Sequence, residues 1–135
     1  MTGFVLDSRL EADSVFLADG PLSQVRLIDD TRFPWLLLVP RVADAVEWID
    51  LDGTRQRLLL AEIHQVGSLL RDEPSVEKLN IGALGNVVRQ LHVHLVGRRQ
   101  DDAAWPAPVW GFGAMQRHDA TLLAEKVSMW RARIA

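Results

Sequence analysis

The sequence predicts an α+β domain built on an antiparallel sheet. Short strand-like runs follow one another along the chain, and only two segments show the spacing of an amphipathic helix. Strands that are neighbours in sequence, with few helices between them, usually pair antiparallel and not through βαβ crossovers. Because 135 residues suffice for one buried core, we assign residues 1–135 to a single domain.

Three strands are expected within the first 40 residues. Residues 14–20, SVFLADG, end at the turn signal Gly20-Pro21, and residues 22–30 alternate in polarity. Residues 35–40, WLLLVP, form a continuous apolar run that ends in a proline. Such a run is typical of a strand buried on both faces.

The rest of the chain combines two helices with two further strands. A helix is expected from Thr54 to about Arg71, and strands at 76–84 and 88–97. A long irregular segment then leads to Asp119, the expected N-cap of a final helix at about 119–134. The apolar stripes that predict the two helices are Leu59, Ile63, Val66 and Leu70, and Leu123, Val127, Trp130 and Ile134.

The composition excludes several classes of protein. Apolar residues make up 48% and charged residues 24%, which is typical of a folded domain. The net charge of −3 favours neither a nucleic-acid partner nor an anionic membrane. The absence of cysteine excludes disulfides and thiolate chemistry. The N-terminal stretch is too charged for a leader, and no run approaches the ~20 apolar residues of a membrane span, so we expect a cytoplasmic protein.

The stretch VVRQLHVHLVGRR, residues 87–99, carries two histidines inside an apolar run. Because side chains alternate along a strand, His92 and His94 share one face and lie about 7 Å apart. The residues that alternate with them, and are expected in the core, are Leu91, Val93 and Leu95.

Three functions fit this pair. The first is a solvated strand face with no further role. The second is metal binding, since His-x-His is a frequent ligand pair; however, no acidic residue follows until Asp101, and neither His64 nor His118 is placed to complete a site. The third is nucleophilic catalysis, because a neutral imidazole attacks phosphorus well near physiological pH.

These residues resemble the signature of the histidine triad (HIT) superfamily of nucleotide hydrolases and transferases, His-φ-His-φ-His-φ-φ with φ apolar. Residues 90–96, QLHVHLV, match its last two histidines and carry a glutamine at the first. NIGALGNVV at 80–88 resembles the loop ahead of the motif, and VRLIDDTRFPWLLLVPR at 25–41 resembles the family's strand–turn–strand. DDAAWPAPVWG at 101–111 resembles the tail of a bacterial subgroup whose motif commonly opens with glutamine. The resemblance covers residues 14–111.

The resemblance implies a five-stranded antiparallel sheet with two helices, paired as a homodimer. It implies that His92 attacks the α-phosphorus of a purine nucleotide and forms a nucleotidyl-histidine, which water or another acceptor resolves. His94 would lie near the bridging or leaving oxygen. The implied substrate is a dinucleoside polyphosphate or a nucleoside phosphoramidate. No cofactor or bound metal is expected, and Mg²⁺ would enter only with a polyphosphate.

The resemblance also assigns supporting residues. Asn80 matches the loop asparagine that supports the site. Leu27 and Asp29 match an apolar residue of the base pocket and an acceptor for the ribose hydroxyls. The backbone carbonyl of Gln90 would orient the imidazole of His92, a role that no side-chain change removes.

Two positions depart from the family pattern. Val87 stands where many members carry a serine or threonine that contacts phosphate, and Asn86 beside it is expected to compensate. Trp35 stands where some members carry a histidine. A catalytically weak nucleotide-binding or interaction protein on the same dimeric scaffold is therefore the alternative, with a metal-binding module third.

Four further residues have open roles. Trp105 and Trp110 fall by resemblance near the dimer contact, where they would border the partner's site or serve as scaffold. Arg98 and Arg99 either steer phosphate or form a solvated strand end.

Overall fold

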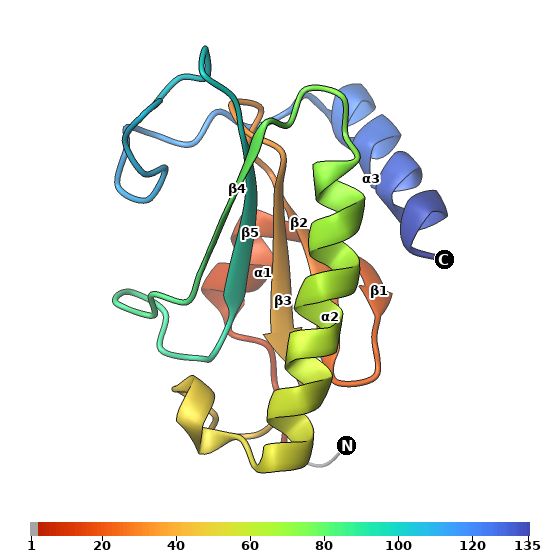
Figure 1. Cartoon of the computed structure of the whole chain (residues 1–135), viewed down its shortest axis with the longest axis vertical. Helices are drawn as coiled ribbons and strands as arrows, with labels where there is room; N and C mark the ends of the chain where they lie inside the picture. The colour runs from red at the N-terminus through yellow and green to blue at the C-terminus, as the bar shows by residue number, and fades with distance from the viewer. Residues whose placement is uncertain (1–2) are drawn as a thin grey trace.

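The computed structural model describes residues 3–135, and Met1 and Thr2 of the expected domain lie outside them. Five strands form one antiparallel sheet (Figure 1) in the order β1-β2-β3-β5-β4. The strands are β1 (Ser14–Asp19), β2 (Ser23–Ile28), β3 (Trp35–Pro40), β4 (Lys78–Gly82) and β5 (Val93–Arg98). The helices are α1 (Ser8–Asp13), α2 (Gly53–Arg71) and α3 (Ala120–Ile134), with a short 3-10 helix, η1, at Trp48–Asp50. The predicted α+β class is confirmed.

The central strand β3 is buried on both faces, as its apolar run predicts. Leu36 and Leu38 face the core beneath α2 and α3, whereas Leu37 and Val39 face the opposite side. All four side chains are 0% exposed. Because burying each such side chain contributes roughly 1.5–3 kcal/mol, this strand joins the two cores that hold the sheet.

Each face of the sheet has its own cover. Helices α2 and α3 lie over one face (Figure 1), where Leu59 and Trp130 enter the core. Helix α1 and the irregular segment 99–119 cover the other face through Leu10 and Val109. The expectation that the histidines could lie on a solvated face is therefore wrong, since α1 and this segment bury that face.

The expectation of two helices is corrected by a third, α1. Its six residues contain one buried apolar side chain, Leu10, so they are too short to show a periodic stripe. The local signal is Asp7, whose side chain accepts from the backbone N–H of Arg9 as an N-cap. The N-cap predicted at Asp119 is confirmed, since its carboxylate accepts from the N–H of Leu122.

The strand predicted at 88–97 begins only at Val93, so His92 precedes β5. The predicted alternation nevertheless holds, and Leu91, Val93 and Leu95 all pack in the core beneath α2 and α3. No helix within residues 3–135 is long and apolar enough to cross a membrane.

Candidate active site

His92 and His94 lie together in a cavity of about 540 Å³. Their ring centroids are 4.8 Å apart and their planes meet at 66°. The volume falls within the roughly 300–1,000 Å³ that is usual for small-molecule sites. The apolar part of its lining includes Leu10, Ile28, Leu37, Leu84, Trp110 and Met115. The cavity therefore pairs two polar rings with a largely apolar wall.

The proton position on His92 follows from its partner. Its Nδ1 lies 2.6 Å from the backbone carbonyl oxygen of Gln90. A carbonyl can only accept a hydrogen bond, so Nδ1 carries the proton of the neutral ring. The lone pair is thereby assigned to Nε2.

The proton on His94 is placed the other way round. The indole Nε1–H of Trp35 donates to Nδ1 of His94 over 3.0 Å. An indole nitrogen can only donate, so the proton of the neutral His94 ring lies on Nε2. Burial, and secondarily the charge of His92, lowers the pKa of His94 to about 3. This ring is consequently neutral at physiological pH and offers an N–H, not a spare positive charge.

Aromatic rings hold His94 in place. Trp35 and Trp110 lie with ring centroids 5.7 and 5.5 Å from the imidazole. The register of the sheet pairs His94 with Leu37 on β3 and with Gly82 on β4. The cavity thus combines a nucleophilic nitrogen on His92 with a hydrogen-bond donor on a rigidly packed His94.

The side chain of Gln90 acts outside the cavity. Its Oε1 accepts from the N–H of Asp7, and its Nε2 donates to the carbonyl of Val5, both over 2.8 Å. Arg9, which lines the cavity, donates to the carbonyl of Val87 over 3.0 Å. These bonds join the segment that leads into α1 to the loop ahead of the histidines.

Neither Arg98 nor Asn80 occupies its expected position. Arg98 is 2% exposed, so a solvated strand end is wrong for this residue. Its guanidinium binds Asp102 at 2.7 and 3.0 Å and donates to Oδ1 of Asn80 over 2.7 Å. Asn80 lies on β4 and not in a loop. Arg99 is exposed and paired with Asp101.

The buried Arg98 secures the segment that forms one wall of the site. Burial would raise the pKa of Asp102, but hydrogen bonds from Arg98 and from three backbone N–H groups lower it to about 2. Arg98 also donates to the carbonyl of Ala107, three residues before Trp110. The guanidinium of Arg98 lies over the ring of Trp105, 5.5 Å from its centroid, whereas Trp110 lines the cavity.

The structure does not bring Leu27 and Asp29 to the histidines. Leu27 packs on the opposite face of the sheet, beneath α2 and α3, so its expected place in the base pocket is wrong. Its neighbour Ile28 lines the histidine cavity. The carboxylate of Asp29 accepts from Nδ1 of His118 over 2.7 Å and from the backbone N–H of that residue over 2.9 Å.

The remaining expected residues divide between the cavity and the surface. Asn86 and Val87 both line the histidine cavity. His64 is exposed on α2. Leu10, Ile28 and Met115 were not predicted, although alternation along β2 is the signal that could have found Ile28. Within residues 3–135 no three histidine or acidic side chains are grouped so as to hold a metal ion.

Comparison with known proteins adds a family to this geometry. A model of the HIT domain family matches residues 9–101. Histidine triad protein blr8122 from Bradyrhizobium japonicum is 50% identical over 98% of this chain and 99% of that chain, with a TM-score of 0.93. A histidine triad protein (SMc02904) from Sinorhizobium meliloti is 46% identical over 99% and 96% of the two chains, with a TM-score of 0.90. A histidine triad protein from Marinobacter aquaeolei is 35% identical over 96% and 95%, with a TM-score of 0.93. Among curated proteins there is no match.

Proposed function

The chain belongs to the HIT domain family, and on that premise we propose that it is a nucleotide hydrolase or transferase acting through His92. The observation that carries the proposal is the opposite protonation of the two rings in one cavity. Because Nδ1 of His92 donates to the carbonyl of Gln90, its Nε2 is unprotonated. Because Nδ1 of His94 accepts from the indole of Trp35, its Nε2 is protonated. A nucleophile and a donor for the displaced oxygen stand side by side.

The proposed reaction has two displacements at the α-phosphorus. Nε2 of His92 forms a P–N bond while the P–O or P–N bond to the leaving group breaks, which gives a nucleotidyl-histidine. The Nε2–H of His94 hydrogen-bonds the atom on which negative charge develops. Water or another acceptor then attacks phosphorus and loses a proton while the P–N bond to His92 breaks; water yields the nucleoside monophosphate, and any other acceptor leaves carrying the nucleotidyl group.

The lining of the cavity supports a nucleotide as the ligand. Leu10 and Ile28 offer an apolar surface for a purine, which the expected Leu27 cannot reach. The amide of Asn86 is the polar side chain beside Val87, where the family pattern has a hydroxyl donor. We propose that this amide contacts a phosphate oxygen in place of the missing hydroxyl.

The alternative is a nucleotide-binding protein with slow catalysis. Val87 favours this alternative. Its side chain lines the cavity and is 76% exposed, but it is apolar and donates no hydrogen bond to a phosphate. One absent charge-assisted hydrogen bond costs about 1.5–3 kcal/mol of transition-state binding. The two functions share the site and differ in turnover.

The test uses wild-type protein and substrates labelled at the α-phosphorus. We expect a nucleoside phosphoramidate or a dinucleoside polyphosphate to release nucleoside monophosphate, and acid quenching within the first turnover to trap label on the protein. Saturable binding of AMP with neither release nor trapped label would assign the chain to the binding alternative. Activity unaffected by chelators is expected with the phosphoramidate, because we propose no metal or cofactor; Mg²⁺ would act only on a polyphosphate substrate.

Trp35→Phe should reduce activity in a manner that depends on the leaving group. The variant retains an aromatic ring but removes the N–H that holds the proton of His94 on Nε2. We expect a fall in kcat of about tenfold to a hundredfold with a poor leaving group, and little change with a good one. Steady-state kinetics on the two substrates measure the difference.

The control for this variant is Trp48→Phe on η1, where the indole is 54% exposed and lies outside the cavity. It should leave both rates unchanged. Equal losses on both substrates after Trp35→Phe would contradict a role for Trp35 in placing the proton.

We also propose that the protein works as a homodimer. Strand β4 is an edge strand of the sheet. Ile81 on β4 and Leu84 just after it are 46% and 43% exposed, so an apolar surface is available for a second copy. No nucleic-acid or membrane partner enters the proposal.

A further inference from the structure

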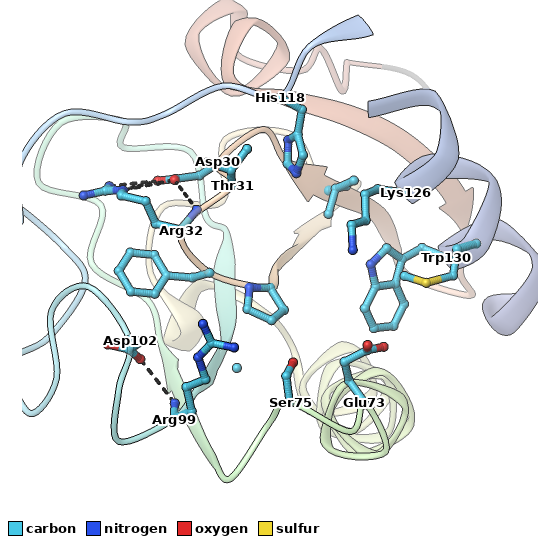
Figure 2. Close-up of a pocket in the computed structure, with 15 residues that line it drawn as sticks. Asp30, Thr31, Arg32, Glu73, Ser75, Arg99, Asp102, His118, Lys126 and Trp130 are labelled. Atoms are coloured by element: carbon cyan, nitrogen blue, oxygen red, sulfur yellow. Dashed lines mark hydrogen bonds and ion pairs between the residues drawn. The ribbon is translucent and has the colours of Figure 1, made fainter. Parts of the chain in front are cut away.

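A second cavity, of about 220 Å³, lies where β2 ends, β3 begins and α3 packs against the sheet. None of its lining residues lines the histidine cavity. Figure 2 shows that Arg99, Lys126 and His118 point into it from three different segments. The hydroxyl of Ser75 faces the same space (Figure 2). Cations and polar groups therefore converge on one cavity.

The carboxylates around this cavity are already neutralised. Asp30 binds Arg32 at 2.8 Å, and Asp102 binds Arg98 at 2.7 Å. Glu73 is paired with Arg133. Arg98 and Arg133 are not part of the lining, so they neutralise the acids from outside. The charge that remains toward the cavity is positive.

Lys126 is the main source of that charge. It stands three residues before Met129 and four before Trp130, which both line the cavity, so it lies on the packed side of α3. It is half-buried, and it forms no ion pair within the part of the chain that the structure describes. Its ammonium group is therefore available to form a charge-assisted hydrogen bond with an anionic ligand.

His118 and Arg99 add two further groups. Nδ1–H of His118 donates to Asp29 over 2.7 Å, so Nε2 of the neutral ring carries the lone pair and can accept from a protonated oxygen of a ligand. Among the ion pairs within residues 3–135, that of Arg99 is with the exposed Asp101 at 3.0 Å, a contact that solvent weakens. A ligand with several oxygens could contact both cations and the imidazole together.

We propose that this cavity binds a small phosphate-bearing molecule, separately from the nucleotide. Two cations and a hydroxyl match the acceptor oxygens of a phosphate group, and the lone pair on Nε2 of His118 matches a protonated phosphate oxygen. The volume lies below the roughly 300–1,000 Å³ of typical small-molecule pockets, so the ligand is inorganic phosphate or a small phosphomonoester and not a nucleotide.

The test is an NMR titration of the full chain with inorganic phosphate, glycerol phosphate and acetate. The signals followed are the indole N–H of Trp130 and the ring of His118. We expect saturable shifts with a phosphate compound, and Lys126→Gln should weaken binding by at least about tenfold. Arg99→Gln should weaken phosphate binding as well. Because Arg99 is exposed, this second variant tests the site even if Lys126→Gln alters the fold. Tighter binding of inorganic phosphate than of glycerol phosphate would identify free phosphate as the ligand class, and the reverse order would identify a phosphomonoester.

Two controls separate this site from the rest of the molecule. Lys78→Gln removes the other lysine, which is exposed on β4 outside the cavity, and should leave binding unchanged. His92→Ala should also leave these shifts intact. The proposal is overturned by shifts confined to the histidine cavity, by no saturation, by equal weakening in Lys78→Gln, or by acetate binding as tightly as phosphate.

Discussion

His92→Ala should abolish covalent labelling and reduce turnover by about 10⁴-fold or more. The variant removes the nitrogen whose lone pair the carbonyl of Gln90 leaves free, so no nucleotidyl-enzyme can form. What remains is binding and the donor on His94, which leave water to attack slowly. Quench-flow with substrate labelled at the α-phosphorus measures both the trapped label and the rate.

His94→Ala provides the contrast within the same cavity. It keeps the nucleophile and removes the donor for the displaced oxygen, so label should still be trapped. A loss of about 10²–10³-fold is expected with a poor leaving group, and a smaller loss with a good one. His64→Ala, on the exposed face of α2, is the matched control and should behave as wild type.

Two outcomes would contradict these roles. Label trapped on His92→Ala would identify another nucleophile. Equal losses in His92→Ala and His94→Ala, whatever the leaving group, would mean that both rings serve only to bind.

Arg98→Met should destabilise the fold by about 3–5 kcal/mol. The side chains of Arg98 and Asp102 are 1% and 3% exposed, so the variant leaves a buried carboxylate without its cation. Arg55→Met is the matched control, because its ion pair with Asp52 lies on the surface with side chains 44% and 56% exposed. Such a pair contributes at most about 1 kcal/mol. Urea unfolding at pH 7 compares the two free energies of unfolding.

The loss in Arg98→Met should shrink as the pH falls. In the wild type, the pKa of Asp102 is lowered from 3.8 to about 2, because the hydrogen bonds that it accepts outweigh the rise caused by burial. The stability that this carboxylate contributes is present above pH 3.8 and is lost as the pH falls toward 2. The difference between wild type and variant should therefore be smaller at pH 3 than at pH 7. A loss no larger than that of Arg55→Met, or one independent of pH, would contradict this account of Arg98.

The two replacements at the family positions illustrate how far sequence reasoning reaches into the site. Gln90 departs from the motif by its side chain, but its carbonyl has the same chemistry as in any residue, so the orientation of His92 was predictable. The sequence showed only that Trp35 replaces the histidine that some members of the family carry at this position. Its bond to His94 joins residues 59 apart in sequence, and no local pattern predicts a contact over that separation.

Local sequence patterns by themselves determined the five strands, the two long helices, the N-cap at Asp119 and the shared face of His92 and His94, because each depends on neighbours along the chain. The tertiary structure alone decided that α1 buries the histidine face, that Ile28 and not Leu27 reaches the cavity, and that Arg98 is buried against Asp102. It also decided that the proton of the His94 ring lies on Nε2, because the indole N–H of Trp35 donates to Nδ1. These features depend on contacts between residues that are distant in sequence. Burial and hydrogen bonding are properties of those contacts, so residue type alone does not predict them.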